Sequence, residues 1–233
     1  MAGPNMDWDH NASPFNAVPP VVLAIVGAMF AVELWFVLSQ AGIVGATRGG
    51  DDARIFALQR FAFSPEIMAM MVERGEYPPS QLMRIVSYPF VHGGFTHMIF
   101  AGVFTLALGK MVGEVLGQVA VAVMFFAGTV AGALAFWLLA GGGALFGAFP
   151  GAYALIGGYT FIMWVHLGRR GENQYGAFTL IGVLLAFQLV FGVLFGAGND
   201  WIADIGGFFA GLFLSVPLAP GGWQRMMERL RRR

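Results

Sequence analysis

The longest uncharged stretch of the chain runs from Val115 to Val165, and it constrains the fold more than any other feature. A helix needs about 20 apolar residues to cross the roughly 30 Å hydrocarbon core of a bilayer. The stretch of 51 residues is therefore long enough for two membrane-spanning helices, which the glycine-rich segment 141–149 separates. With 58% hydrophobic and 11% charged residues, the composition is that of a single membrane domain.

Four more apolar segments fit the same interpretation. We predict an all-α membrane protein with six transmembrane helices in a domain that covers residues 18–218. A tail of residues 1–17 precedes this domain, and a basic tail of residues 219–233 follows it. The four further spans are Val18–Gln40, Ile85–Gly109, Ala177–Asn199, and a last one that Asp200 and Asp204 open and that ends near Leu218.

The connection between the first two predicted spans, residues 41–84, is long and charged. Apolar residues recur at helical spacing over Ala53–Glu73. This pattern predicts at least one amphipathic helix that lies along the membrane interface.

Basic residues in short connections indicate the orientation of a membrane protein. Lys110 follows the second span, Arg169 and Arg170 follow the fourth, and five arginines lie in the C-terminal tail. With six spans these regions share one side, so we predict a multi-pass protein of the bacterial inner membrane with both termini in the cytoplasm. The zero net charge gives no indication of nucleic-acid binding, and the absence of cysteine excludes disulfides and thiolate chemistry.

The segment Gly147–Val165 is the predicted centre of the fold. Its first half consists largely of small residues, which let helices approach closely, so we expect other helices to surround it. Proline suits the first turn of a helix because its missing N–H needs no partner there, so Pro150 predicts a helix start. The predicted topology brings candidate residues to one membrane level, where they could line a cavity: His92, His97, Pro150, Gly151 and Asp204.

Three segments resemble the rhomboid intramembrane serine proteases: Ser87–Gly109, Phe149–Tyr159 and Ala203–Gly211. In that family, span two carries two histidines and an asparagine, span four opens with Gly-x-Ser-Gly, and span six carries His-x-x-Gly-x-x-x-Gly. Met83-Arg84 stands where the family's long first loop has Trp-Arg. The resemblance implies a rhomboid-like bundle with a long outer loop between helices 1 and 2. It also implies structural roles for three residues: Arg84, Gly207 and Gly211.

The chain departs from the family at each catalytic position. Pro150 stands at the position of the serine nucleophile, Asp204 at that of the basic histidine, and Ala101 at that of the oxyanion-hole asparagine. Of the family's polar site residues, only His92 and His97 are retained. Proline has no hydroxyl to attack a peptide bond and no N–H to donate. The resemblance therefore implies a member with no intact catalytic set.

Three functions follow from these residues. The one we favour is a pseudoprotease that binds transmembrane segments of client proteins without cleaving them, as inactive members of this superfamily do. The alternative is an active intramembrane peptidase with a site rebuilt around His97 and Asp204. A third is transport of a small solute, with Glu33 and Asp204 as relay groups. For Glu33, inside the first span, we favour a protonated or hydrogen-bonded side chain that faces the bundle.

A rebuilt site would also be the place for a metal ion. His92, His97 and Asp204, with Asp200, carry nitrogen and oxygen ligands that suit zinc. Histidines five residues apart do not share a helical face, however, so we predict no metal and no cofactor. We predict instead that Asp204 pairs with His97. The expected partners are the lipid bilayer and transmembrane clients.

Overall fold

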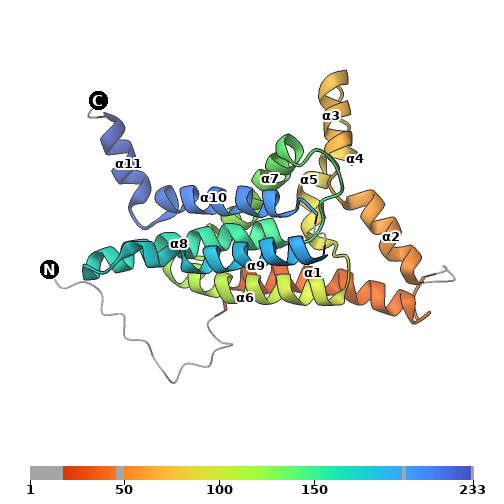
Figure 1. The fold of residues 1–233 in the computed structure, drawn as a ribbon, viewed down its shortest axis with the longest axis horizontal. Helices are drawn as coiled ribbons and strands as arrows, with labels where there is room; N and C mark the ends of the chain where they lie inside the picture. Colours follow the sequence, from red (N-terminus) through yellow and green to blue (C-terminus); the bar gives the residue numbers. More distant parts are fainter. Residues whose placement is uncertain (1–17, 46–49, 196–197, 232–233) are drawn as a thin grey trace.

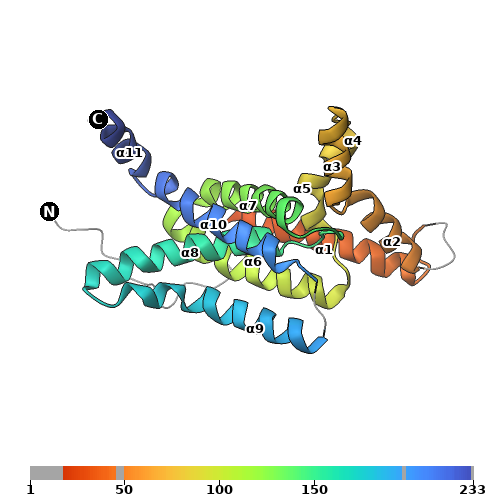
Figure 2. The same cartoon turned by 45° about the horizontal axis from the view of Figure 1, so that its top comes forward.

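The computed structural model describes residues 18–45, 50–195 and 198–231, so the predicted N-terminal tail lies outside the described part. The regular structure of these residues is helical, as predicted. Six long helices among them lie side by side as a bundle (Figures 1 and 2): α1 (Pro20–Gln40), α6 (Phe95–Leu116), α7 (Gln118–Leu139), α8 (Phe149–Arg170), α9 (Thr179–Phe195) and α10 (Trp201–Leu218).

Four of the described helices are long and apolar enough to cross a membrane, namely α1, α6, α7 and α10. They support an integral membrane bundle. α8 has 22 residues, which at 1.5 Å per residue is about 33 Å, and α9 has 17 residues. The predicted six spans therefore depend on α8 and α9 crossing the bilayer as well.

α8 lies at the centre of the bundle. Every residue from Pro150 to Gly158 is buried, and the helices that pack most extensively on α8 are α10 and α7. Two glycines of α10 allow this approach. A Cβ added at Gly207 would overlap the carbonyl of Pro150, and a Cβ added at Gly211 would overlap that of Ala154. The Gly207-x-x-x-Gly211 pattern is therefore a helix-packing surface.

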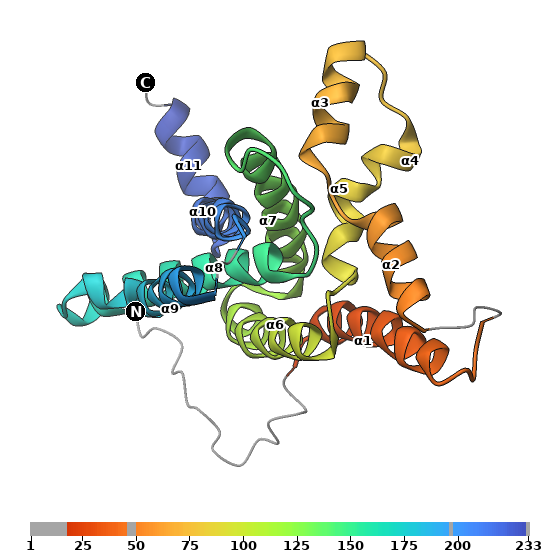
Figure 3. The ribbon, with the colours of Figure 1, turned by 45° about the vertical axis from the view of Figure 1, so that its right-hand side comes forward.

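The amphipathic segment predicted over Ala53–Glu73 forms two helices, α2 (Gly50–Phe61) and α3 (Pro65–Arg74). Phe63 interrupts them because its backbone N–H and carbonyl both pair with those of Leu145, at 2.9 Å each. Figure 3 shows α2 beside α1, while α3 projects away from the bundle.

Two very short helices complete the long connection, α4 (Pro79–Leu82) and α5 (Arg84–Ser87). Arg84 donates hydrogen bonds to the Ala62 carbonyl at 2.8 Å and to Gln81 Oε1 at 2.6 Å. It therefore ties α5 to the segment that follows α2, and the structural role implied for Arg84 stays a prediction.

The second predicted span is shifted along the chain. We predicted Ile85–Gly109, whereas α6 covers Phe95–Leu116 and follows the 3₁₀ turn η1 (Tyr88–Phe90). Pro89 and the pair Gly93-Gly94 interrupt the apolar run before the helix begins. At the other end, Lys110 and Glu114 are one helical turn apart and form an ion pair at 3.9 Å. These charges do not end the helix.

The boundaries of the last two predicted spans lie close to those of α9 and α10. α9 begins at Thr179, after the 3₁₀ turn η2 (Gln174–Phe178). α10 ends at Leu218, so Pro217 lies inside its last turn. After a turn at Gly221, α11 (Gly222–Arg231) leaves the bundle at an angle (Figure 1).

Candidate functional site

The segment before α8 positions the candidate site. Gly147 donates its N–H to the Tyr88 carbonyl at 3.0 Å and has φ of +91°, which favours glycine. A Cβ at Gly147 would lie 2.6 Å from Nε2 of His97. The missing side chain thus lets this backbone pack directly against the histidine ring, just before α8 begins at Phe149.

His97 of α6 faces Phe149 rather than Pro150. Its ring stacks on that of Phe149, with 5.3 Å between centroids and 17° between planes. The His92 ring meets it edge-on at 5.2 Å, and Phe146 lies 6.0 Å away. The two histidines predicted to share a site are therefore together, in an aromatic environment. His92 lies in the coil before α6 and is only 1% exposed.

Pro150 packs on the opposite side, against α7. A Cβ added at Gly132 would lie 2.6 Å from Cβ of Pro150. The proline ring is therefore packed against α7, and its carbonyl is covered by Gly207 of α10. The next residue, Gly151, faces Phe125, because an added Cβ would lie 2.6 Å from that ring. Neither residue carries a hydroxyl.

Ala101 lies one turn after His97 in α6 and is fully buried. Its methyl group carries no hydrogen-bond donor, and its carbonyl accepts a hydrogen bond from the Thr105 hydroxyl at 2.8 Å. The side-chain donor that the family has at this position is therefore not replaced by Ala101.

Asp204 has a partner that the sequence analysis missed. Its side chain is 3% exposed and accepts a hydrogen bond from Nε2 of Gln188 in α9 at 2.6 Å. The predicted pairing with His97 is not among the hydrogen bonds of the described residues. Gln188 is the sole amide in an otherwise apolar helix. That isolated polar side chain was the signal available in the sequence.

Glu33 forms a buried ion pair between α1 and α2. Its carboxylate, 1% exposed, accepts two hydrogen bonds from Arg54 at 2.7 and 2.9 Å. The same guanidinium donates to the His92 carbonyl at 2.8 Å and lies over the Phe36 ring at 4.8 Å. Glu33 thus faces the bundle as predicted. Arg54 joins three segments, including the one that carries His92.

The candidate metal ligands do not converge. Among the described residues, no group of three His, Asp or Glu side chains is arranged so that it could hold a metal ion. The described contacts divide the candidates instead into two groups, one around His97 and one around Asp204.

Comparison with known proteins identifies the family. Residues 79–221 match the Rhomboid domain, which is more than half of the chain. The chain is also 24% identical over 160 residues to Rhomboid-like protease 3 of Toxoplasma gondii. That match covers 66% of this chain and 59% of the relative's length. With the apolar helix bundle and its glycine-packed centre, the Rhomboid domain match shows that the chain belongs to the rhomboid family.

Proposed function

We propose that this rhomboid-family chain is a membrane pseudoprotease that binds transmembrane segments of client proteins without cleaving them. The observation that carries the proposal is the absence of a hydroxyl at the start of α8. The side chains there are Phe149, which contacts His97, and Pro150, which packs on α7. Serine-type hydrolysis requires a nucleophile within hydrogen-bond reach of a base.

Four buried hydroxyls elsewhere in the described chain are held in structural hydrogen bonds. The hydroxyls of Thr105, Thr129 and Ser215 each donate to a carbonyl one turn earlier in their own helix, at 2.7 to 2.9 Å. The Tyr88 hydroxyl donates to the Thr129 carbonyl at 2.7 Å. These groups are committed to structural hydrogen bonds, which supports a site without a nucleophile.

The two groups that a rebuilt peptidase would use are held by other partners. His97 stacks on Phe149, and Asp204 accepts from Gln188. The relative is named a protease, but this chain differs from the family pattern at the nucleophile and the base, so we do not transfer that activity. Binding without cleavage remains as the function that a rhomboid-family bundle without the nucleophile supports.

A direct test compares labelling with binding. The full chain in detergent micelles is exposed to a fluorophosphonate probe, and separately to a transmembrane test peptide that carries a photo-crosslinker. We expect no labelling above a heat-denatured control, together with a crosslink and no cleavage of the peptide. Labelling or cleavage would refute the proposal. Crosslinking of the transmembrane peptide that is no stronger than crosslinking of a soluble scrambled peptide would refute it as well.

We further propose six spans with both termini in the cytoplasm of a bacterial cell. The support is the distribution of Lys110, Arg169, Arg170 and the C-terminal arginines. A periplasm-specific reporter fused after Arg233 should be inactive, whereas a cytoplasm-specific reporter at the same place should be active. The opposite pattern would contradict this orientation.

A further inference from the structure

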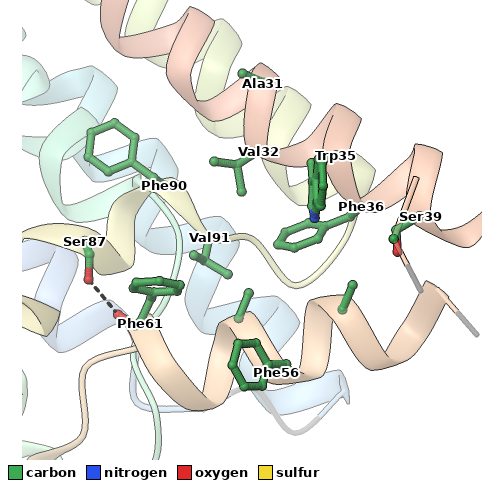
Figure 4. A pocket seen from close by; sticks show the side chains of 13 residues that line it. Ala31, Val32, Trp35, Phe36, Ser39, Phe56, Phe61, Ser87, Phe90 and Val91 are labelled. Carbon is green, nitrogen blue, oxygen red and sulfur yellow. Dashed lines mark hydrogen bonds between the residues drawn. The ribbon is translucent and has the colours of Figure 1, made fainter. Parts of the chain in front are cut away.

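A cavity of about 980 Å³ lies between α1 and α2 (Figure 4), and no residue of α8 lines it. Its walls are almost entirely apolar. α1 contributes Val32, Trp35 and Phe36, and α2 contributes Phe56 and Ala57. Trp35 is 53% exposed and Phe56 is 64% exposed, so the cavity opens at the protein surface. Because α1 is long and apolar enough to cross a membrane, an apolar opening beside it would face lipid rather than water.

The length of the cavity along α1 is comparable to the thickness of one leaflet. Along α1 it extends from Ala31 to Ser39, which at 1.5 Å per residue is about 12 Å. Half of the roughly 30 Å hydrocarbon core is about 15 Å. The volume is in the range that holds small ligands, about 300–1,000 Å³. A flexible apolar chain that enters from one leaflet matches this length, volume and lining.

Phe61 and Ser87 line one end of the cavity, and two arginines lie close to them in the sequence. The Ser87 hydroxyl donates to the Phe61 carbonyl at 3.1 Å, drawn as a dashed line in Figure 4. Arg84 donates to the next carbonyl, that of Ala62, at 2.8 Å. Arg60 directly precedes Phe61 at the end of α2. The Arg84 guanidinium is therefore bonded to the strip of chain that closes this end, and Arg60 adjoins that strip in the sequence.

These arginines form a local excess of positive charge. Burial and the neighbouring charge of Arg60 lower the pKa of Arg84, so the two groups act on each other. Neither takes part in the ion pairs between described residues. Two adjacent cations without a described carboxylate partner attract an anion, and anionic lipid surfaces attract arginine in this way.

We propose that the cavity between α1 and α2 binds one acyl chain of an anionic phospholipid, with its phosphate group against Arg60 and Arg84. The apolar walls account for the chain, and the arginine pair accounts for the charge of the headgroup. This lipid site lies outside the candidate site at α8 and does not depend on whether the chain cleaves peptides.

The test uses the full chain, purified in detergent, stripped of lipid and analysed by native mass spectrometry. The two probes are phosphatidylglycerol and phosphatidylcholine with identical acyl chains. A double variant, Ala31→Phe with Ala53→Phe, fills the cavity from both walls, and Ala107→Phe on the exposed side of α6 is its control. Arg60→Gln removes one charge, and Arg74→Gln on α3 is the matched control.

We expect the parent chain to retain phosphatidylglycerol in preference to phosphatidylcholine. The cavity-filling variant should lose most of this binding, and Arg60→Gln should weaken it about fivefold, while both controls bind as the parent does. Equal retention of the two lipids by the parent would overturn the proposal, as would unchanged binding in the cavity variant. If a transmembrane test peptide bound the parent but not the cavity variant, while both retained phosphatidylglycerol, the cavity would belong to a protein segment.

Discussion

Replacing Gly207 by alanine tests the packing that places α8 in the bundle. The added Cβ would overlap the Pro150 carbonyl oxygen, and it would lie 2.8 Å from the carbonyl carbon and 3.1 Å from Cα of the same residue. These are backbone atoms at the buried start of α8, so no side-chain rotation relieves the overlap. α8 and α10 must instead move apart.

The magnitude follows from two opposing effects. In a helix interior, alanine is favoured over glycine by about 1 kcal/mol, whereas overpacking of a core costs about 1–3 kcal/mol and occasionally more. Gly27→Ala in α1 isolates the first effect, because no atom lies within 4 Å of its added Cβ. The difference between the two variants is then the overpacking cost. We expect the upper end, about 3 kcal/mol, because the opposing atoms are backbone.

Thermal unfolding in detergent, followed by tryptophan fluorescence, measures this difference. For a chain of this size, about 3 kcal/mol corresponds to a Tm lower by roughly 6–12 °C. Gly211→Ala, which opposes the Ala154 carbonyl, should behave as Gly207→Ala does. If Gly207→Ala unfolded at the same temperature as Gly27→Ala, the close approach of α8 and α10 would be refuted.

Three further predictions concern polar contacts. Arg54→Ala leaves the Glu33 carboxylate buried without its partner, which should lower the free energy of unfolding by about 3–5 kcal/mol; a loss below about 1 kcal/mol, as for surface pairs, would show that the pair is solvated. Asp204→Ala and Gln188→Ala should be non-additive in thermal unfolding, with a coupling of about 0.5–3 kcal/mol, whereas Asp204→Ala and His97→Ala should add; the reverse would restore the Asp204–His97 pair. Hydrogen bonds from the Ser64 hydroxyl and the Gly143 N–H hold the pKa of Glu66 below its usual range. A carboxyl whose pKa is lowered in the folded state stabilises the fold above the unfolded-state pKa of roughly 4.3, and this stabilisation is lost as the pH falls. Glu66→Gln should therefore be less stable than the parent chain at pH 7 but equally stable in acid. A stability deficit independent of pH would contradict this.

The long helices were largely predictable because the bilayer constrains length and composition together. The break before α8 and its start at Phe149, next to Pro150, follow from glycine and proline, whose backbone preferences are local. The start of α6 was not predicted, because the segment from Ile85 carries no charge that would mark a break, whereas Pro89 and Gly93-Gly94 change the backbone. Its end was also misplaced, because Lys110 and Glu114 are compatible with a helix that continues past them.

The site was predictable only as a region. The sequence predicted that His92 and His97 could line one cavity. In the structure their rings contact each other, and the His97 ring stacks on Phe149 at the start of α8. The partners of the buried acids were not predictable, because Arg54 and Gln188 come from other segments and no local pattern links them to Glu33 and Asp204. The side chain that faces His97 is Phe149, one residue before Pro150, which stands at the family's nucleophile position, and one residue is a rotation of about 100° on a helix.

The burial of the first half of α8 has a consequence for biosynthesis. Its small residues give it less affinity for lipid than the four strongly apolar helices have, and its stability in the membrane comes from the walls that α7 and α10 provide. α10, however, is synthesised after α8. The nascent chain therefore holds α8 without one of its walls until the last span emerges, and insertion of the centre of this protein is coupled to the arrival of its C-terminal part.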